Sequence, residues 1–229
     1  MPVLIESVLF PNTFGMELIY SFVIIFCSLI IYFSTKKMYD ISKYPGIKYF
    51  RESFLFFAIA YFFKSFLSFL LVTFGFHEAL EFSSIFWGIL TLFVFMYAST
   101  MAIFYLFYSV VWKKIKHKKF VIPAIHILVI ILSIASIITR TAGLLVLLQV
   151  VVFLFIAIYN FISYKKLNPK KKAGSIHLIY LFLFAFWMLN LSDILISGFD
   201  PIFELVISLV SIGIFLMILY KVTSNVGAK

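Results

Sequence analysis

The sequence predicts an all-α, polytopic integral membrane protein, a bundle of seven transmembrane helices in which residues 1–229 form a single domain. Hydrophobic residues make up 64% of the chain and charged residues only 12%, whereas soluble domains are usually about 25% charged. Seven apolar runs are each about as long as a membrane-spanning helix requires. The cations gather in every second loop between these runs, which is typical of proteins that cross a membrane repeatedly.

The seven expected spans follow one another with short loops. They cover Leu18–Ser34, Ser53–Phe76, Phe82–Trp112, Phe120–Thr139, Thr141–Tyr164, Leu178–Phe199 and Ile202–Tyr220. The third span is long enough to tilt or to project beyond the membrane. The fourth and fifth are divided at Arg140, Thr141 and Gly143, because the joined run of about 45 residues would be twice a span. The longest loop, Thr35–Glu52, is expected to hold a turn or a brief interfacial helix.

The distribution of charge predicts the orientation. Clusters of basic residues follow spans one, three and five, whereas on the other side Arg140 stands among acidic residues. The two sets are Lys36, Lys37, Lys43, Lys48, Arg51, Lys113, Lys114, Lys116, Lys118, Lys119, Lys165, Lys166, Lys170, Lys171 and Lys172, against Glu6, Glu17, Glu78, Glu81, Asp200 and Glu204. The positive-inside rule therefore predicts a cell-membrane protein with its N-terminus outside the cell and its C-terminus in the cytoplasm. The basic loops are expected to contact anionic lipid headgroups.

Composition also excludes several classes of function. The net charge of +10 is explained by the membrane-proximal loops, so nucleic-acid binding is not expected. Cys27 is the single cysteine, and the four histidines show no metal-ligand spacing, so neither a disulfide nor a metal site is predicted. No cofactor is expected. No nucleophile motif occurs, so enzyme activity is not expected either, although intramembrane chemistry stays open.

A cation lies inside the second span. Lys64 interrupts the apolar run Phe54–Phe76, which as a helix would be about 34 Å long. A charge at the centre of a bilayer costs about 2.5–3.5 kcal/mol on insertion scales, so such residues face a bundle interior or an aqueous cavity. Lys64 shares one helix face with Tyr61, Ser65 and Ser68, so this face is predicted to point inward.

The candidate ligand- or ion-binding residues are the polar and aromatic side chains near the outer ends of the spans: Lys64, Asp193, Asn190, Glu204, Tyr61, Trp187 and Arg140. The leading hypothesis pairs Lys64 with Asp193 in a cavity open to the outside, the lysine stem covering a depth difference of about 9 Å. Lys64 with Glu204 and Asp193 with Arg140 are alternatives, and so is a purely structural pair. Asn190 is better explained as a hydrogen-bonding contact between helices than as a ligand-binding residue, and the outer glutamates, Glu17 among them, are equally explained as solvated residues.

The chain also contains an internal similarity. YFSTKK before the second span resembles FISYKK before the sixth, and 27 residues separate Lys37 from Lys64 and Lys166 from Asp193. Spans one to three and five to seven would then form two repeats, with the fourth as a linker, a 3+1+3 arrangement about an axis along the membrane normal. The other explanation is that two basic loops before Phe-rich helices look alike.

In layout the seven predicted spans resemble heptahelical receptors and microbial rhodopsins, and the 3+1+3 arrangement is similar to small sugar transporters of the SWEET and PQ-loop type. The chain also looks like the seven-helix membrane sensors that precede some prokaryotic histidine kinases. Ile202–Tyr220 lacks the lysine that binds retinal in microbial rhodopsins, and the Asp-Arg-Tyr and Asn-Pro-x-x-Tyr receptor motifs are absent. The resemblance is therefore one of layout.

Two functions are compatible with these features. The first is a sensor or receptor-like protein that binds a ligand in the outer polar cavity and signals to a separate cytoplasmic partner. The second is a small transporter or channel that uses the Lys64 and Asp193 charges. The inner halves of the second, sixth and seventh spans are almost entirely Phe, Leu and Ile, which favours the sensor. A structural or assembly subunit is the third hypothesis, and a homo-oligomer is left open.

Overall fold

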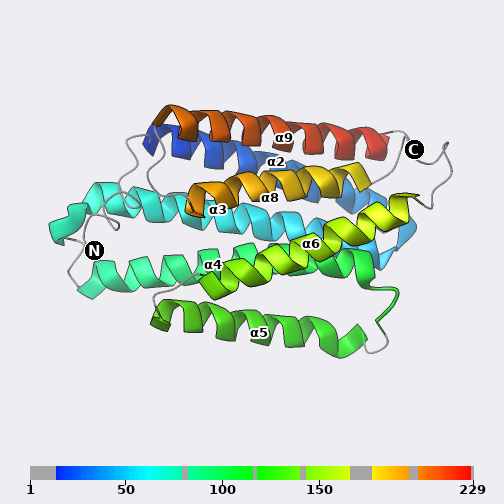
Figure 1. The fold of residues 1–229 in the computed structure, drawn as a ribbon, viewed down its shortest axis with the longest axis horizontal. Coiled ribbons are helices and arrows are strands. Elements are labelled where there is room, and N and C mark those ends of the chain that lie inside the picture. The colour runs from blue at the N-terminus through cyan, green and yellow to red at the C-terminus, as the bar shows by residue number, and fades with distance from the viewer. Residues whose placement is uncertain are drawn as a thin grey trace.

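The computed structural model describes residues 14–78, 82–115, 118–139, 143–165, 177–195 and 201–227. Within these ranges the regular secondary structure is helical, which confirms the all-α prediction. The helices are α2 (Phe14–Ser42), α3 (Pro45–Glu78), α4 (Phe82–Val111), α5 (Lys118–Thr139), α6 (Gly143–Lys165), α8 (His177–Leu195) and α9 (Pro201–Gly227), and they lie side by side as an elongated bundle (Figure 1).

Six of the described helices are long and apolar enough to cross a membrane. The qualifying stretches are Gly15–Ser42, Pro45–Phe69, Phe86–Val111, Phe120–Thr139, Leu145–Ile162 and Leu205–Ser224, and α8 adds the shorter apolar stretch Leu178–Leu191. The chain is therefore a helical membrane protein with several apolar helices.

The prediction of a long loop over Thr35–Glu52 is wrong. Helix α2 continues to Ser42 and α3 already begins at Pro45, so the connection consists of Lys43 and Tyr44. Lys43 has a left-handed backbone (φ 50°), and its N–H donates to the Tyr39 carbonyl at 2.7 Å, which ends α2. Proline is favoured in the first turn of a helix because its missing N–H would have no helical partner there. The division of the long fourth and fifth run is confirmed, since α5 ends at Thr139 and α6 begins at Gly143.

Six of the helices form a closed ring and α5 lies outside it. Around the ring, α2 contacts α3, α3 contacts α4, α4 contacts α6, α6 contacts α8, α8 contacts α9, and α9 returns to α2. Helix α5 lies against α4 and α6 at the edge of the bundle (Figure 1). The main core fills the ring and takes buried side chains from all six members: Ile24, Phe54, Leu106, Phe153, Phe186 and Phe215.

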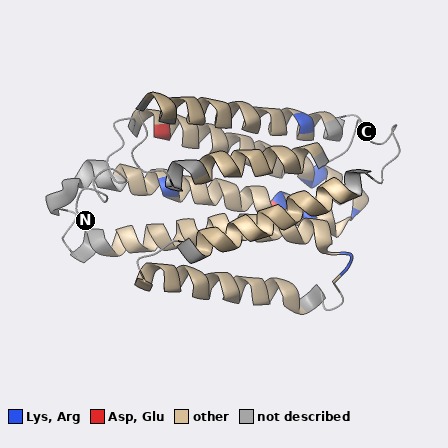
Figure 2. Ribbon diagram, in the orientation of Figure 1, with Lys and Arg blue, Asp and Glu red and all other residues tan. Residues whose placement is uncertain are grey.

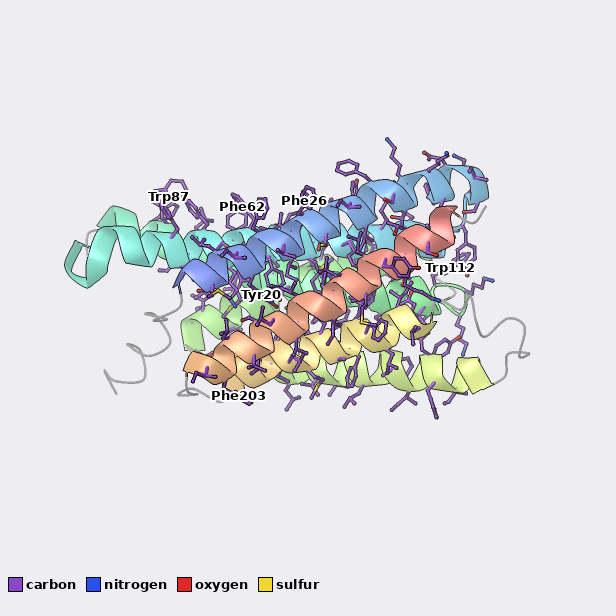
Figure 3. The ribbon with its side chains drawn as sticks, turned by 90° about the horizontal axis from the view of Figure 1, so that it is seen from above. Tyr20, Phe26, Phe62, Trp87, Trp112 and Phe203 are labelled. Atoms are coloured by element: carbon purple, nitrogen blue, oxygen red, sulfur yellow. The ribbon has the colours of Figure 1, made fainter. Side chains whose placement is uncertain are left out.

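The outer surface of the bundle is strongly apolar. Phe26, Phe62 and Trp87 point away from the other helices along one edge (Figure 3), and each is more than half exposed. On α5, Ile127, Ile131 and other large aliphatic side chains are exposed in the same way, because this helix packs against neighbours on one side alone. Such a surface suits contact with lipid chains rather than water.

Charged residues divide the bundle into two ends (Figure 2). At the basic end, several cations lie over tyrosine rings: Lys43 over Tyr39, Arg51 over Tyr32, Lys113 over Tyr44 and Lys114 over Tyr159. Aromatic rings and basic side chains at one level are typical of a membrane–water interface. The opposite end, where α2 begins, holds Glu17, and Lys64 lies in the same half of the bundle because its ammonium is 3.5 Å from the Glu17 carboxylate.

Candidate functional site

Three helices meet at a polar cluster in the half of the bundle opposite the basic end. The hydroxyls of Tyr20 on α2 and Tyr61 on α3 donate to Asn190 Oδ1 on α8, at 2.7 and 2.8 Å, and the two hydroxyl oxygens are 3.2 Å apart. Asn190 Nδ2 donates to the Phe186 carbonyl at 2.8 Å, which fixes the orientation of the amide. Both tyrosines are buried, and their rings meet edge to face at 5.7 Å. This tyrosine–asparagine cluster joins α2, α3 and α8.

An ion pair lies one helical turn farther from the basic end. Lys64 Nζ on α3 is 3.5 Å from Glu17 Oε1 on α2. Ser68 Oγ donates to the other carboxylate oxygen, Oε2, at 3.1 Å. The Lys64 side chain is 28% exposed and that of Glu17 is 17% exposed, so the pair lies at the boundary of the bundle rather than in its core. The carboxylate is held by a charge-assisted contact and a hydroxyl donor together.

Helical periodicity places these groups on facing sides of α2 and α3. Tyr61, Lys64 and Ser68 are spaced i, i+3 and i+7 and share the α3 face that was predicted to point inward. Glu17 and Tyr20 are three residues apart on α2, which runs antiparallel to α3. Each helix therefore presents one charged group and one tyrosine at matching levels. The ion pair and the cluster form one continuous polar site.

The structure brings together some of the residues that the sequence predicted for the site. Tyr61, Asn190 and Lys64 meet at this site. Trp187 is buried one turn from Asn190 and packs against Phe153, with ring centroids 5.1 Å apart. The side chains of Asp193 and Glu204, and the whole of Arg140, lie outside the described residues. The pairing of Lys64 with Asp193 therefore stays a prediction.

Two residues of the site were missed by the sequence-based reasoning. Glu17 was interpreted as a solvated residue at the outer rim, although it contacts Lys64 and Ser68. Tyr20 is absent from the predicted site, although its hydroxyl donates to Asn190. The available signal was their spacing: Glu17 and Tyr20 lie on one face near the start of α2, at the same end of the bundle as the Lys64 face.

Toward the basic end, the polar site is followed by a layer of buried aromatic rings. Phe54 and Phe57 of α3 meet Phe186 of α8 and Phe215 of α9, and all four side chains are at most 4% exposed. Ring centroids are 4.9 Å apart for Phe186 and Phe215, 6.2 Å for Phe54 and Phe215, and 6.5 Å for Phe57 and Phe186. The centroids of the Tyr61 and Phe186 rings are 6.1 Å apart. The aromatic layer therefore adjoins the tyrosine–asparagine cluster on the side toward the basic end.

A second polar contact joins α4 and α5. The hydroxyls of Tyr97 and Tyr105 lie 2.7 and 3.1 Å from Nδ1 and Nε2 of His126, and Phe56 of α3 packs against this group. A neutral imidazole donates from one ring nitrogen and accepts at the other, which suits two hydroxyl partners. The observed partners are tyrosines.

Replacing His126 by Phe is expected to lower the free energy of unfolding by about 1–2 kcal/mol, because two half-buried hydroxyls lose their partner. Thermal unfolding of the purified protein in detergent measures the change. Ile127→Ala, at an exposed position of the same helix, is the matched control and should shift the midpoint little. Equal shifts for the two variants would contradict a specific role for the imidazole.

Gln149 and Asn160 make hydrogen bonds that suit a structural role. Gln149 Nε2 donates to Thr100 Oγ1 at 2.9 Å and joins α6 to α4, while Asn160 Nδ2 donates to the Ile156 carbonyl of its own helix. Among the residues that the structure describes, no group of three or more His, Cys, Asp or Glu side chains could hold a metal ion.

Comparison with known proteins gives one informative similarity. The chain is 27% identical over 209 residues to an uncharacterized protein of the archaeon Archaeoglobus fulgidus, and the alignment covers 90% of each chain. No model of a known protein family matches the chain, and no solved structure matches it. The similarity extends over nearly the whole length, so it concerns the bundle as a unit and not a single helix.

Proposed function

We propose that the protein is a heptahelical, receptor-like sensor of the cell membrane, in which α8 spans the membrane together with the six longer helices and the N-terminus lies outside. Its ligand would enter from the outer side and bind at the Lys64–Glu17 pair and the tyrosine–asparagine cluster. The observation that carries this proposal is the combination of a partly exposed polar site with a fully buried aromatic layer between it and the basic end. A polar site that is closed toward the cytoplasm suits ligand detection from outside.

Depth along α3 supports this location. Arg51 lies at the basic end, and 13 residues separate it from Lys64, which is about 20 Å of helix. A hydrocarbon core is about 30 Å thick, so Lys64 would lie roughly 10 Å below the outer boundary. A ligand could reach this depth from the outer surface without crossing the aromatic layer.

The cluster also offers a route for the signal. Asn190 Oδ1 accepts both tyrosine hydroxyls, so a ligand that binds either hydroxyl would weaken a contact between α8 and the α2–α3 pair. Helices α2 and α9 extend to the basic end and contact each other, so a shift between them would reach the cytoplasmic surface. Because a ligand shifts an equilibrium only through differential affinity, the two arrangements would have to differ at the cluster. A separate cytoplasmic partner would read this change.

Cysteine accessibility tests the proposal. In a Cys27→Ser background, Ser68→Cys places a thiol beside Glu17, and Phe57→Cys places one in the aromatic layer. A membrane-impermeant thiol reagent should label Ser68→Cys from the outside only and should leave Phe57→Cys unlabelled from both sides. Intact cells and inside-out vesicles provide the two directions of access.

The other outcomes are equally informative. Absence of labelling at Ser68→Cys would mean that the polar site is sealed, and the ligand site would be wrong. Labelling of Ser68→Cys from the cytoplasmic side alone would overturn the orientation. Labelling of Phe57→Cys from the cytoplasmic side, together with Ser68→Cys from outside, would indicate alternating access and a transporter.

A transporter is the second candidate, and the ring of helices favours it. Exchanging α2, α3 and α4 with α6, α8 and α9 maps every contact of the ring onto another contact of the ring and leaves α5 as the linker. This is the contact pattern that a 3+1+3 repeat with a pseudo-two-fold axis would produce.

The register of buried residues agrees with such a repeat. Adding 129 to the number of a buried residue in α2 or α3 gives an inward-facing residue in α6 or α8, with the same offset for both helix pairs. The pairs are Tyr20 and Gln149, Ile24 and Phe153, Cys27 and Ile156, Phe54 and Leu183, Phe57 and Phe186, and Tyr61 and Asn190. Tyr61 and Asn190 hydrogen-bond to each other, as equivalent residues next to the axis would. Rocking of such halves is how many secondary transporters work.

A further inference from the structure

A separate charged feature lies at the basic end, where α2 meets α3. The Arg51 guanidinium lies against two tyrosines of α2, with Cζ 4.9 Å from the centre of the Tyr32 ring and 5.7 Å from that of Tyr39. Its Nη2 donates to Glu52 Oε1 at 2.9 Å, and its side chain is 13% exposed. The two rings and the carboxylate therefore hold the guanidinium plane in one orientation.

The surroundings of Arg51 are positively charged. Lys36 lies on the α2 face of Tyr32 and Tyr39, four residues after the first and three before the second, and it is exposed. Lys48, one turn before Arg51 on α3, is exposed as well. Nearby Lys43 and Asp40 form an ion pair at 3.9 Å and cancel each other. Near the seam, the three cations Lys36, Lys48 and Arg51 therefore outnumber the single carboxylate of Glu52.

We infer that the α2–α3 seam at the basic end binds the phosphate of an anionic phospholipid headgroup, with Arg51 as the central contact. Arginine carries five N–H donors, and its planar fork matches the geometry of phosphate oxygens. The position also fits, because Arg51 lies three residues before the apolar run of α3 that begins at Phe54, near the level where a headgroup meets the hydrocarbon core. Tyr32 and Tyr39 supply an amphipathic wall of the kind found at that level. This site does not depend on the proposed outer ligand site.

Titration with phosphatidylglycerol tests the inference. The lipid should raise the midpoint of thermal unfolding of the detergent-purified protein, and Arg51→Gln should raise the lipid concentration needed for half of this effect by about tenfold. Lys113→Gln is the matched control: it removes another cation at the basic end that lies over a tyrosine ring, but in the turn that follows α4. It should change that concentration less than twofold, because exposed charges are screened by salt. Equal effects of the two variants would show diffuse attraction and overturn the inference.

Further titrations distinguish a lipid phosphate from free inorganic phosphate and control for misfolding of the variant. Phosphatidylcholine should leave the midpoint of the wild-type protein nearly unchanged. If inorganic phosphate reproduces the stabilisation in the wild-type protein, the assignment to a lipid is wrong. If Arg51→Gln does not fold, Arg51→Lys replaces it in the titration, since it keeps the charge but lacks the planar fork. Arg51→Lys should then weaken the lipid effect more than Lys113→Gln does, and a smaller loss would overturn the inference.

Discussion

Replacing Lys64 by Met is expected to lower the free energy of unfolding by about 2 kcal/mol, because it leaves the Glu17 carboxylate in the apolar bundle without its cation. Removing one partner of a fully buried pair costs about 3–5 kcal/mol, and the partial exposure of both side chains reduces that value. Thermal unfolding in detergent measures the change, with roughly 2–4 °C of midpoint per kcal/mol for a chain of this size.

A double-mutant cycle identifies the partner of Lys64. Glu17→Gln alone should be destabilising by a similar amount, and the Lys64→Met/Glu17→Gln double variant should recover most of the loss, because no unpaired charge is left. Lys48→Met, which removes an exposed cation of the same helix at the basic end, should have little effect. If the losses of the two single variants simply add in the double variant, Glu17 is not the partner that Lys64 depends on.

Asn190→Leu is expected to destabilise the protein by about 3 kcal/mol. The substitution removes the acceptor of two hydroxyls, those of Tyr20 and Tyr61, and both tyrosines are buried. A buried donor left without an acceptor costs about 1–3 kcal/mol. The same measurement of thermal unfolding applies, and intrinsic tryptophan fluorescence would report on Trp187, one turn away on α8.

Removing the hydroxyls tests whether the hydrogen bonds cause this loss. Tyr20→Phe alone should cost about 1 kcal/mol, because Tyr61 still donates to Asn190. The triple variant Tyr20→Phe/Tyr61→Phe/Asn190→Leu should be more stable than Asn190→Leu alone, since replacing all partners by apolar groups leaves no unsatisfied donor. A triple variant as unstable as the single one would mean that packing around position 190, and not the polar cluster, determines the loss.

About half of the residues of the candidate site could be predicted from the sequence. Lys64 and Tyr61 were identified because a cation inside an apolar run must be compensated, and helical spacing showed which neighbours share its face. Asn190 and Trp187, three residues apart on α8, were among the candidate residues as well. Helical spacing could not identify the residue that compensates Lys64. Several acidic residues lie near the outer ends of the spans, and the periodicity of one helix does not show which other helix its polar face meets.

The structural role of α5 shows the same limit. Its apolar run was recognised from hydropathy, and its separation from α6 followed from the length of the joined run. Its place outside the ring of six helices, held by His126 between Tyr97 and Tyr105, was not predictable. Large aliphatic residues cover several sides of α5, so composition does not distinguish a face that meets lipid from one that meets protein.

The class of the molecule, the existence of the seven described helices, the basic end and the inward polar face of α3 were all predictable without a structure. These properties depend on local composition and on the 3.6-residue period, which each segment carries independently of the others. Three features emerge from the packing of the helices against one another: Glu17 faces Lys64, Tyr20 and Tyr61 share Asn190, and an aromatic layer lies between them and the basic end. Lipid chains are as apolar as the helix surfaces, so the order of helices around the ring depends on how closely all of them pack together and not on apolar character alone.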